Sequence, residues 1–294
     1  MIAEPVPHGR VNSAVAERGP TALRIAVGGQ LRKLREENKI TREAAGEHIR
    51  GSHAKISRLE LGRTGFKERD IRDLLSLYGV SDPGELEQFL DLVRKANQPG
   101  WWHRYSDLLP SWFETYLGLE HAAKSIRTYE GQLIPGLLQT ADYARSVVAL
   151  GHDEDGERRV SLRRHRQELL TREGAPTFWA VLDESVLRRP VGGPAVMRGQ
   201  LEYLIKISQL PNVTIQVLPY AAGGHAAAGS SFTMLRFAES ELPDIVYLEQ
   251  LTSALYLDRR EDLELYRQVM DQLSVQAEPP ERSREFLTEI ADAL

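Results

Sequence analysis

The sequence contains no cysteine and no long run of apolar residues. Without cysteine, neither a disulfide nor a thiolate metal site can form, so the chain has no need of an oxidising compartment. No window approaches the roughly 18 uninterrupted apolar residues that a membrane span requires. The first 20 residues also lack the apolar segment of a signal peptide. These absences exclude a disulfide-stabilised or membrane-spanning protein and predict a cytoplasmic one.

The length and composition indicate more than one folded unit. At 294 residues the chain is longer than a typical domain of roughly 100 to 200 residues. Its content of 41% hydrophobic and 27% charged residues is typical of a globular protein. The predicted boundaries are a disordered leader at 1–20, a helical domain at 21–98 and an α+β domain at 99–294.

The net charge of −5 is unevenly distributed along the chain. Residues 24–69 carry 12 Arg or Lys against 6 Asp or Glu, a net charge of +6, whereas the remaining residues have 25 against 36, a net charge of −11. A basic segment beside an acidic body indicates a polyanionic partner for that segment. A solvated, charge-rich helix pair would give the same count, so charge alone leaves both interpretations open.

Apolar spacing predicts helices throughout the first 100 residues. A first helix has its apolar face at three- and four-residue spacing, and Thr41 caps a second helix. Ser52 caps a third helix, and Gly62 follows it where a left-handed C-cap is expected. The expected inward positions are Leu23, Val27, Leu31, Leu34, Ala44, Ala45, Ile49, Ile56 and Leu59. Helices at 67–78 and 83–96 complete a five-helix unit.

After residue 100 helical stretches alternate with runs rich in β-forming residues. Helices are expected at roughly 137–150, 157–172, 194–209, 260–274 and 282–293. The six predicted strands are SIRTYEGQL, TFWAVLDE, VTIQVLP, SFTMLRF, DIVYLEQ and ALYLD. Connections after Leu218 are too short for repeated helical crossovers, which favours mostly antiparallel pairing. The predicted fold is mainly α and multidomain: a five-helix bundle with a helix-turn-helix, then a larger α+β domain.

The stretch REAAGEHIRGSHAKISRLELG, residues 42–62, has the parts of a helix-turn-helix. Two short helices joined by a tight turn can present the second helix to the DNA major groove. Gly46 supplies the small residue that close packing of the two helices needs. The outward positions of the second of these helices form a basic, hydrogen-bonding face that suits base edges and phosphates, with nothing acidic until Glu60: His53, Ala54, Lys55, Ser57 and Arg58.

The segment VGGQLRKLREENKITREAAGEHIRGSHAKISRLELGR resembles the Xre-type (phage repressor and Cro-like) helix-turn-helix over about 55 residues. The resemblance implies that His53, Ala54 and Arg58 read bases. It also implies that a second set of residues holds phosphate or supports the readers: Arg42, Lys55, Ser57, Arg63 and Thr64. The cap Ser52 is a further candidate DNA contact. One departure is Arg50 at the turn position that usually holds Gly. With Gly51 beside it, we expect a turn shifted by one residue.

The remainder of the chain is similar to the C-terminal domain of a large actinobacterial, mainly streptomycete, regulator family. The resemblance covers residues 101 to about 275 and includes WFETYLGLEHAAKSIRTYEGQLIPGLLQTADYARSVV and NVTIQVLPYAAGGHAAAGSSFTMLRF. Members are antitoxin-like transcriptional regulators, often encoded beside a very small partner protein. The resemblance implies such a partner and supplies no ligand.

Other motifs carry weak signals. The run at 223–231 lacks the ending of a phosphate-binding P-loop and is predicted to be a hairpin or lid loop. The eight histidines show no metal-ligand spacing, so neither a metal nor a cofactor is expected. No nucleophile, base and orienting group can be identified, so we expect no catalytic residues and no enzyme. The candidates for a ligand pocket are Tyr129, Gln132, Gln139, Tyr143 and His225.

These patterns predict a sequence-specific transcriptional regulator. It would bind an inverted-repeat operator in double-stranded DNA as a homodimer, because one recognition helix contacts too few base pairs to select a site. The larger domain would dimerise and sense a small molecule or a small partner protein. The alternative is an antitoxin-like protein that masks a small neighbour-encoded partner and regulates its own synthesis. An enzyme in the larger domain is a less favoured hypothesis.

Overall fold

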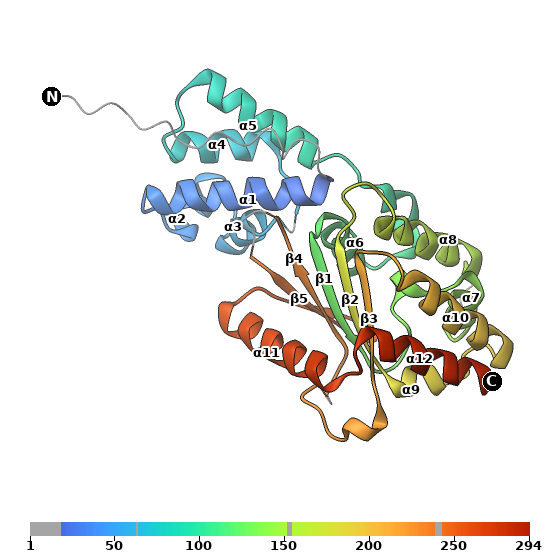
Figure 1. Cartoon of the computed structure of the whole chain (residues 1–294). Coiled ribbons are helices and arrows are strands. Elements are labelled where there is room, and N and C mark those ends of the chain that lie inside the picture. Colours follow the sequence, from blue (N-terminus) through green and yellow to red (C-terminus); the bar gives the residue numbers. More distant parts are fainter. Residues whose placement is uncertain (1–18, 63, 152–154, 228, 239–242) are drawn as a thin grey trace. The chain divides into compact units, whose positions relative to one another are not determined.

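A computed structural model describes residues 19–62, 64–151, 155–227, 229–238 and 243–294. The chain divides into two compact units, the first ending at Trp101 and the second spanning Trp102 to Leu294 (Figure 1). In the described ranges no helix has the length and apolar character that crossing a membrane requires. The predicted leader, 1–20, lies outside the described residues except at its end.

The first unit is helical, as the apolar spacing predicts. Its helices are α1 (Pro20–Glu37), α2 (Arg42–His48), α3 (His53–Glu60), α4 (Glu68–Leu77) and α5 (Pro83–Ala96). Helix α1 begins at Pro20, one residue before the predicted start of this domain. Proline suits this first helical position, where no backbone N–H is needed. Ala44 was wrongly predicted to point inward; it is exposed, and Ala45 is buried.

The two predicted N-caps of the helix-turn-helix are confirmed. The Ala44 amide donates to the Thr41 hydroxyl at 3.1 Å, and the Lys55 amide donates to the Ser52 hydroxyl at 3.3 Å. Gly62 has the expected left-handed conformation, with φ of 63°. Each N-cap satisfies a backbone donor that a helix end leaves without an intrahelical partner.

The turn between α2 and α3 is not shifted, which corrects the expectation drawn from Arg50. Arg50 itself adopts the left-handed conformation, with φ of 54°. Its amide donates to Glu47 O at 3.0 Å, and the Gly51 amide donates to Gly46 O at 2.8 Å. These two bonds form a Schellman ending of α2. The arginine therefore occupies the glycine position of the turn without moving it.

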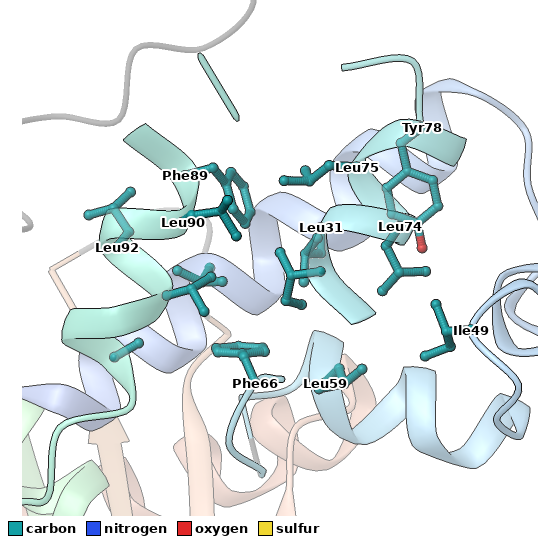
Figure 2. Close-up of a cluster of buried hydrophobic side chains, with 14 of the residues drawn as sticks. Leu31, Ile49, Leu59, Phe66, Leu74, Leu75, Tyr78, Phe89, Leu90 and Leu92 are labelled. Carbon is teal, nitrogen blue, oxygen red and sulfur yellow. The ribbon is translucent and has the colours of Figure 1, made fainter. Parts of the chain in front are cut away.

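A single apolar cluster holds the five helices together. Leu31 of α1, Leu59 of α3, Leu74 of α4 and Leu90 of α5 are buried in it (Figure 2). Ile49, at the end of α2, joins the same cluster. Because every helix contributes, the orientation of α3 depends on the packing of the whole unit.

The second unit is built on a six-stranded mixed sheet with strand order β3-β2-β1-β4-β5-β6. The strands are β1 (Ser125–Glu130), β2 (Thr177–Asp183), β3 (Val213–Leu218), β4 (Phe232–Arg236), β5 (Ile245–Glu249) and β6 (Ala254–Leu257). The helices are α6 (Ser111–Ala122), α7 (Ala141–Ala149), α8 (Gly156–Gln167), α9 (Glu184–Arg188), α10 (Pro194–Ile207), α11 (Arg260–Gln276) and α12 (Pro280–Asp292). Short 3₁₀ segments are η2 (Trp101–Leu108), η3 (Gly136–Leu138), η4 (Glu168–Leu170) and η5 (Tyr220–Ala222).

The predicted antiparallel character is confirmed for the later strands. β4 pairs with β1 and β5, and β5 pairs with β6, all antiparallel. β1, β2 and β3 are parallel neighbours, because helices lie in the connections between them. The carboxyl ends of these three strands therefore lie at one edge of the sheet.

Helices cover both faces of this sheet. On one face, Met270 and Leu273 of α11 pack into a buried cluster with Tyr129 of β1. On the other face, Tyr116 of α6 stacks on Tyr247 of β5, with ring centroids 4.2 Å apart. Side chains alternate between the two faces along a strand, so neighbouring residues of one strand belong to different layers.

Gly46 allows α2 to approach α3 closely, and its replacement tests that packing. A Cβ atom at Gly46 would lie 2.9 Å from Ser52 C and 3.1 Å from His53 N. Because both contacts are with backbone, we expect Gly46→Ala to destabilise the first unit by about 1 to 3 kcal/mol. Amide hydrogen exchange of α2 and α3 measures this loss.

Gly199→Ala is the matched control, since Gly199 also lies inside a helix but a Cβ atom there would meet nothing within 4 Å. Alanine at this position should be neutral or stabilise the second unit by up to about 1 kcal/mol. Equal protection of α2 and α3 in wild type and Gly46→Ala would contradict the close approach.

Candidate nucleic-acid interface

The outward face of α3 carries most of the residues predicted to contact DNA. His53 and Arg58 are exposed, whereas Ala54 and Ser57 are half-buried. Within the described residues Arg58 forms no ion pair and no side-chain hydrogen bond. Its guanidinium therefore has all its donors available to a partner, and a guanidinium can bind guanine in a bidentate way. Ser52, also exposed, already accepts a hydrogen bond as the N-cap of α3.

Arg42 forms an ion pair within the first unit, which its position in the sequence does not reveal. Its Nε donates to Glu60 Oε2 at 3.0 Å, and its side chain is 37% exposed. Glu60 itself is buried, so the outward face of α3 carries no acidic residue. Arg42 therefore connects the start of α2 to the end of α3 and presents only part of its guanidinium to solvent.

Glu60 is the centre of a buried ion network. Arg35 of α1 donates from Nε to Glu60 Oε1 at 2.5 Å and from Nη2 to Oε2 at 3.2 Å. The same guanidinium donates from Nη1 to the carbonyl of Ile40 at 2.9 Å. The hydrogen bond from Arg35 to Glu60 raises the pKa of Arg35 above its ordinary value. Together with Arg42, this network ties α1, α2 and α3 at one carboxylate.

Lys55 is also tied to the protein. Its Nζ lies 2.5 Å from Asp70 Oδ2 of α4, and its side chain is 30% exposed. The pair links the recognition helix to α4, so the main role of Lys55 is to hold that helix in position. Thr64 is half-buried. Arg63 lies outside the described residues, so its predicted phosphate contact stays a prediction.

Arg50 is the residue that motif reasoning missed as a candidate contact. It is exposed on the turn that precedes α3 and forms no ion pair among the residues that the structure describes. The motif assigns this position a turn-forming role alone, so only the observed exposure identifies it. Arg50, His53 and Arg58 form the cationic and hydrogen-bonding surface that is free to meet an acidic partner.

The buried network can be tested with Glu60→Gln. The amide keeps the shape of the side chain but removes the buried counter-charge of the Arg35 guanidinium, 8% exposed, and leaves it only the exposed carboxylate of Glu36 at 3.2 Å. Removing one partner of a buried ion pair costs about 3 to 5 kcal/mol, and we expect a loss near 3 kcal/mol because the amide oxygen still accepts one bond. Urea unfolding followed through hydrogen exchange of α1 and α3 measures it.

Glu37→Gln removes one negative charge from the exposed surface of α1 and serves as the control. A surface charge contributes little, so its effect should stay within about 0.5 kcal/mol. Similar small effects for both variants would show that the Glu60 network does not hold the helices together.

The predicted pocket residues of the second unit fall into two separate groups. Tyr129 and His225 come together: the Tyr129 hydroxyl lies 3.3 Å from His225 Nε2. Asp183 Oδ2 lies 3.9 Å from the same nitrogen. Tyr129 is buried, and burial raises its pKa to about 12. Gln132 is exposed and belongs to neither group.

Gln139 and Tyr143 hold the loop that follows β1. Gln139 Nε2 donates to the carbonyl of Ile134 at 2.8 Å, and the Ile134 amide donates to the Tyr143 hydroxyl at 3.2 Å. Gln200 and Gln167 also bond main-chain groups of this loop. Both candidate residues thus act on the main chain of the loop, and burial raises the pKa of Tyr143.

Glu130, which is not among the predicted pocket residues, is a carboxyl group whose pKa is raised by its surroundings. Glu130, the last residue of β1, accepts a hydrogen bond from Thr128 Oγ1 at 3.2 Å. Burial raises the pKa of Glu130 to about 7, and the charge of Glu249 acts in the same direction. In the described ranges no three His, Asp or Glu side chains are placed to hold a metal ion.

The raised pKa makes the stability of the second unit depend on pH through Glu130. Between the ordinary value near 4.5 and the folded value near 7, the folded protein binds more protons at this site than the unfolded chain does. The contribution is fully present below pH 4.5 and is lost as the pH rises to 7. Relative to Glu130→Gln, the wild type should therefore lose about 2 to 3 kcal/mol over this window.

Urea unfolding of both proteins at several pH values between about 5 and 8 measures the difference. Comparing the two proteins cancels the contribution of every other titrating group to the pH dependence. A constant difference across this range would contradict the buried, proton-binding state of Glu130.

Comparison with known families agrees with this division of the chain. Residues 26–89 match a family model described as a helix-turn-helix domain. Residues 113–289 match a model described as a domain of unknown function, DUF5753. No curated protein and no solved structure matched the sequence.

Proposed function

Since the chain belongs to the family defined by DUF5753 and also carries a helix-turn-helix domain, we propose that it is a sequence-specific transcriptional regulator rather than an enzyme. The helix-turn-helix domain suggests a DNA-binding regulator. The proposal adds that the domain is of the Xre type, that it reads an operator, and that the second unit controls this binding.

The observation that carries the proposal is that some basic side chains of α2 and α3 form ion pairs within the unit, whereas others are exposed. Arg42 and Lys55 form ion pairs inside the unit. His53 and Arg58 are exposed along the recognition helix, and Arg50 is exposed on the turn. Ion pairs fix the helix, and the remaining donors face outward, which is the arrangement that base readout in a major groove needs.

A homodimer on an inverted repeat follows from the size of this surface. One eight-residue recognition helix covers too few base pairs to select a site in a genome. Two copies related by a two-fold axis would place their helices in successive major grooves, about 34 Å apart. We propose that the second unit contributes to pairing and senses a small molecule or small protein, in line with its resemblance to antitoxin-like actinobacterial regulators.

The proposal is tested by selecting binding sites from a pool of random DNA duplexes with the full-length protein. We expect an inverted repeat with half-site centres one helical turn apart, bound by two protomers. Arg58→Ala should weaken binding to the selected site by about 1 to 3 kcal/mol and relax the preference at one base pair per half-site. Competition with random duplex at several salt concentrations measures the selectivity.

Lys95→Ala is the matched control, because Lys95 lies exposed on α5, outside the helix-turn-helix, and its ion pair is with a surface aspartate. It should leave the selected sequence and the selectivity unchanged. Enrichment of no sequence would overturn the operator-reading function. Equal losses on selected and random DNA for Arg58→Ala would overturn its role as a base reader.

A further inference from the structure

Polar side chains line one face of the sheet where β1, β4 and β5 meet. Tyr129 pairs with Phe232, and Thr233 pairs with Tyr247. Extending the first register by one pair and the second by two places Glu130, Ser231 and Glu249 side by side across three strands. Neighbouring strands lie about 4.8 Å apart, so the Cα atoms of Glu130 and Glu249 are about 10 Å apart, and both side chains project from the same face of the sheet.

The next positions on the same face are also polar. Thr128 and Thr233 are buried, and their hydroxyls lie 3.0 Å apart. The Tyr247 hydroxyl donates to Glu249 Oε2 at 2.9 Å. A sheet face covered by helices is ordinarily apolar, as it is here at Ile126 and Phe178 of the parallel strands. This end of the sheet departs from that rule.

An arginine of α8 faces the same region. Arg166 of α8 lies over the ring of Tyr116, which stacks on Tyr247, the residue whose hydroxyl bonds Glu249. Arg163 lies one turn earlier on α8, and the Glu249 charge acts on both Arg163 and Glu130. Burial lowers the pKa of Arg163 to about 10, which leaves it charged at neutral pH. Both Glu130 and Arg163 nevertheless remain half-buried rather than closed to solvent.

Glu130 and Arg163 have no ion-pair partner among the described residues. In the part of the chain that the structure describes, Glu130 has no cation and Arg163 no carboxylate at ion-pair distance, and Arg163 Nη1 donates only to the carbonyl of Arg159, at 3.2 Å. Arg166, one turn further along α8, is satisfied by two bonds to Glu120, at 2.8 and 3.0 Å. Partly buried charges without an ion-pair partner are costly, and groups with perturbed pKa values concentrate at functional sites.

We propose that the region between Arg163, Glu249 and Glu130 binds a free α-amino acid as the effector of the regulator. The ligand's carboxylate would pair with the Arg163 guanidinium, and its ammonium would lie against Glu249 and Glu130. Such a zwitterion compensates both kinds of unpaired charge at once, which neither a simple anion nor a simple amine does. The regulatory role of the ligand rests on the proposed function, whereas its binding at this site does not.

The site is tested on the full-length protein without DNA. The probes are the 20 common α-amino acids, first as a mixture and then singly, at millimolar concentration in a thermal unfolding assay with calorimetric titration of any that bind. Two further sets isolate each charge: the N-acetyl amino acids lack the ammonium, and the amino acid amides lack the carboxylate. We expect at least one amino acid to raise the unfolding temperature, and its two blocked forms to bind at least about tenfold more weakly.

Four variants assign the contacts. Glu130→Gln and Arg163→Gln should each weaken binding at least about tenfold. Arg164→Gln removes the neighbouring arginine, which is exposed on α8, and should bind like the wild type. Circular dichroism and binding to the selected DNA verify that each variant is folded, and Arg163→Lys, which keeps the charge, should retain part of the affinity.

The absence of binding by every amino acid would overturn the site while leaving DNA recognition intact. Binding that survives both Glu130→Gln and Arg163→Gln would also overturn it. Equal binding of an amide and its parent amino acid would overturn the role of Arg163. Amino acid binding without any effect on DNA affinity would keep the site and reject its role as effector site.

Discussion

The ion pairs at Glu60 are the constraint on which the first unit depends. One carboxylate, buried at the end of the recognition helix, accepts bonds from Arg35 of α1 and Arg42 of α2. A buried charge of this kind is tolerated only when its partners are in place, so the three helices have one favourable arrangement. Tight packing at Gly46 and the left-handed turn at Arg50 then fix the approach of α2 to α3.

This constraint separates cations that hold the fold from cations that are available to DNA. Both kinds look alike in the sequence, where Arg42, Lys55 and Arg58 are all basic residues of one helix pair. Their difference arises from partners 15 to 18 residues away, Asp70 for Lys55 and Glu60 for Arg42. Sequence spacing therefore predicts the helices, caps and buried stripe, whose causes are local, but not which charges are neutralised within the fold.

The same limit applies more strongly to the second unit. Its six strands and their antiparallel half are predictable, because alternation and connection length are local properties. Glu130, Ser231 and Glu249 come together only through the pairing of β1 with β4 and of β4 with β5. No motif connects residues so far apart in the chain. Residues chosen from one continuous stretch, such as Gln139 and Tyr143, hold a loop instead.

Arg163 and Arg166 show that two arginines one turn apart on the same helix can differ in whether the fold neutralises their charge. Arg166 is enclosed by Glu120 and lies over the rings of Phe113 and Tyr116, so its charge is satisfied within the fold. Arg163 lies one turn earlier on α8, yet no carboxylate among the described residues pairs with it. In the first unit the pairing of Arg42 similarly contrasts with the free guanidinium of Arg58. In both units, internal ion pairs hold a helix in place next to an arginine that has no ion-pair partner among the described residues.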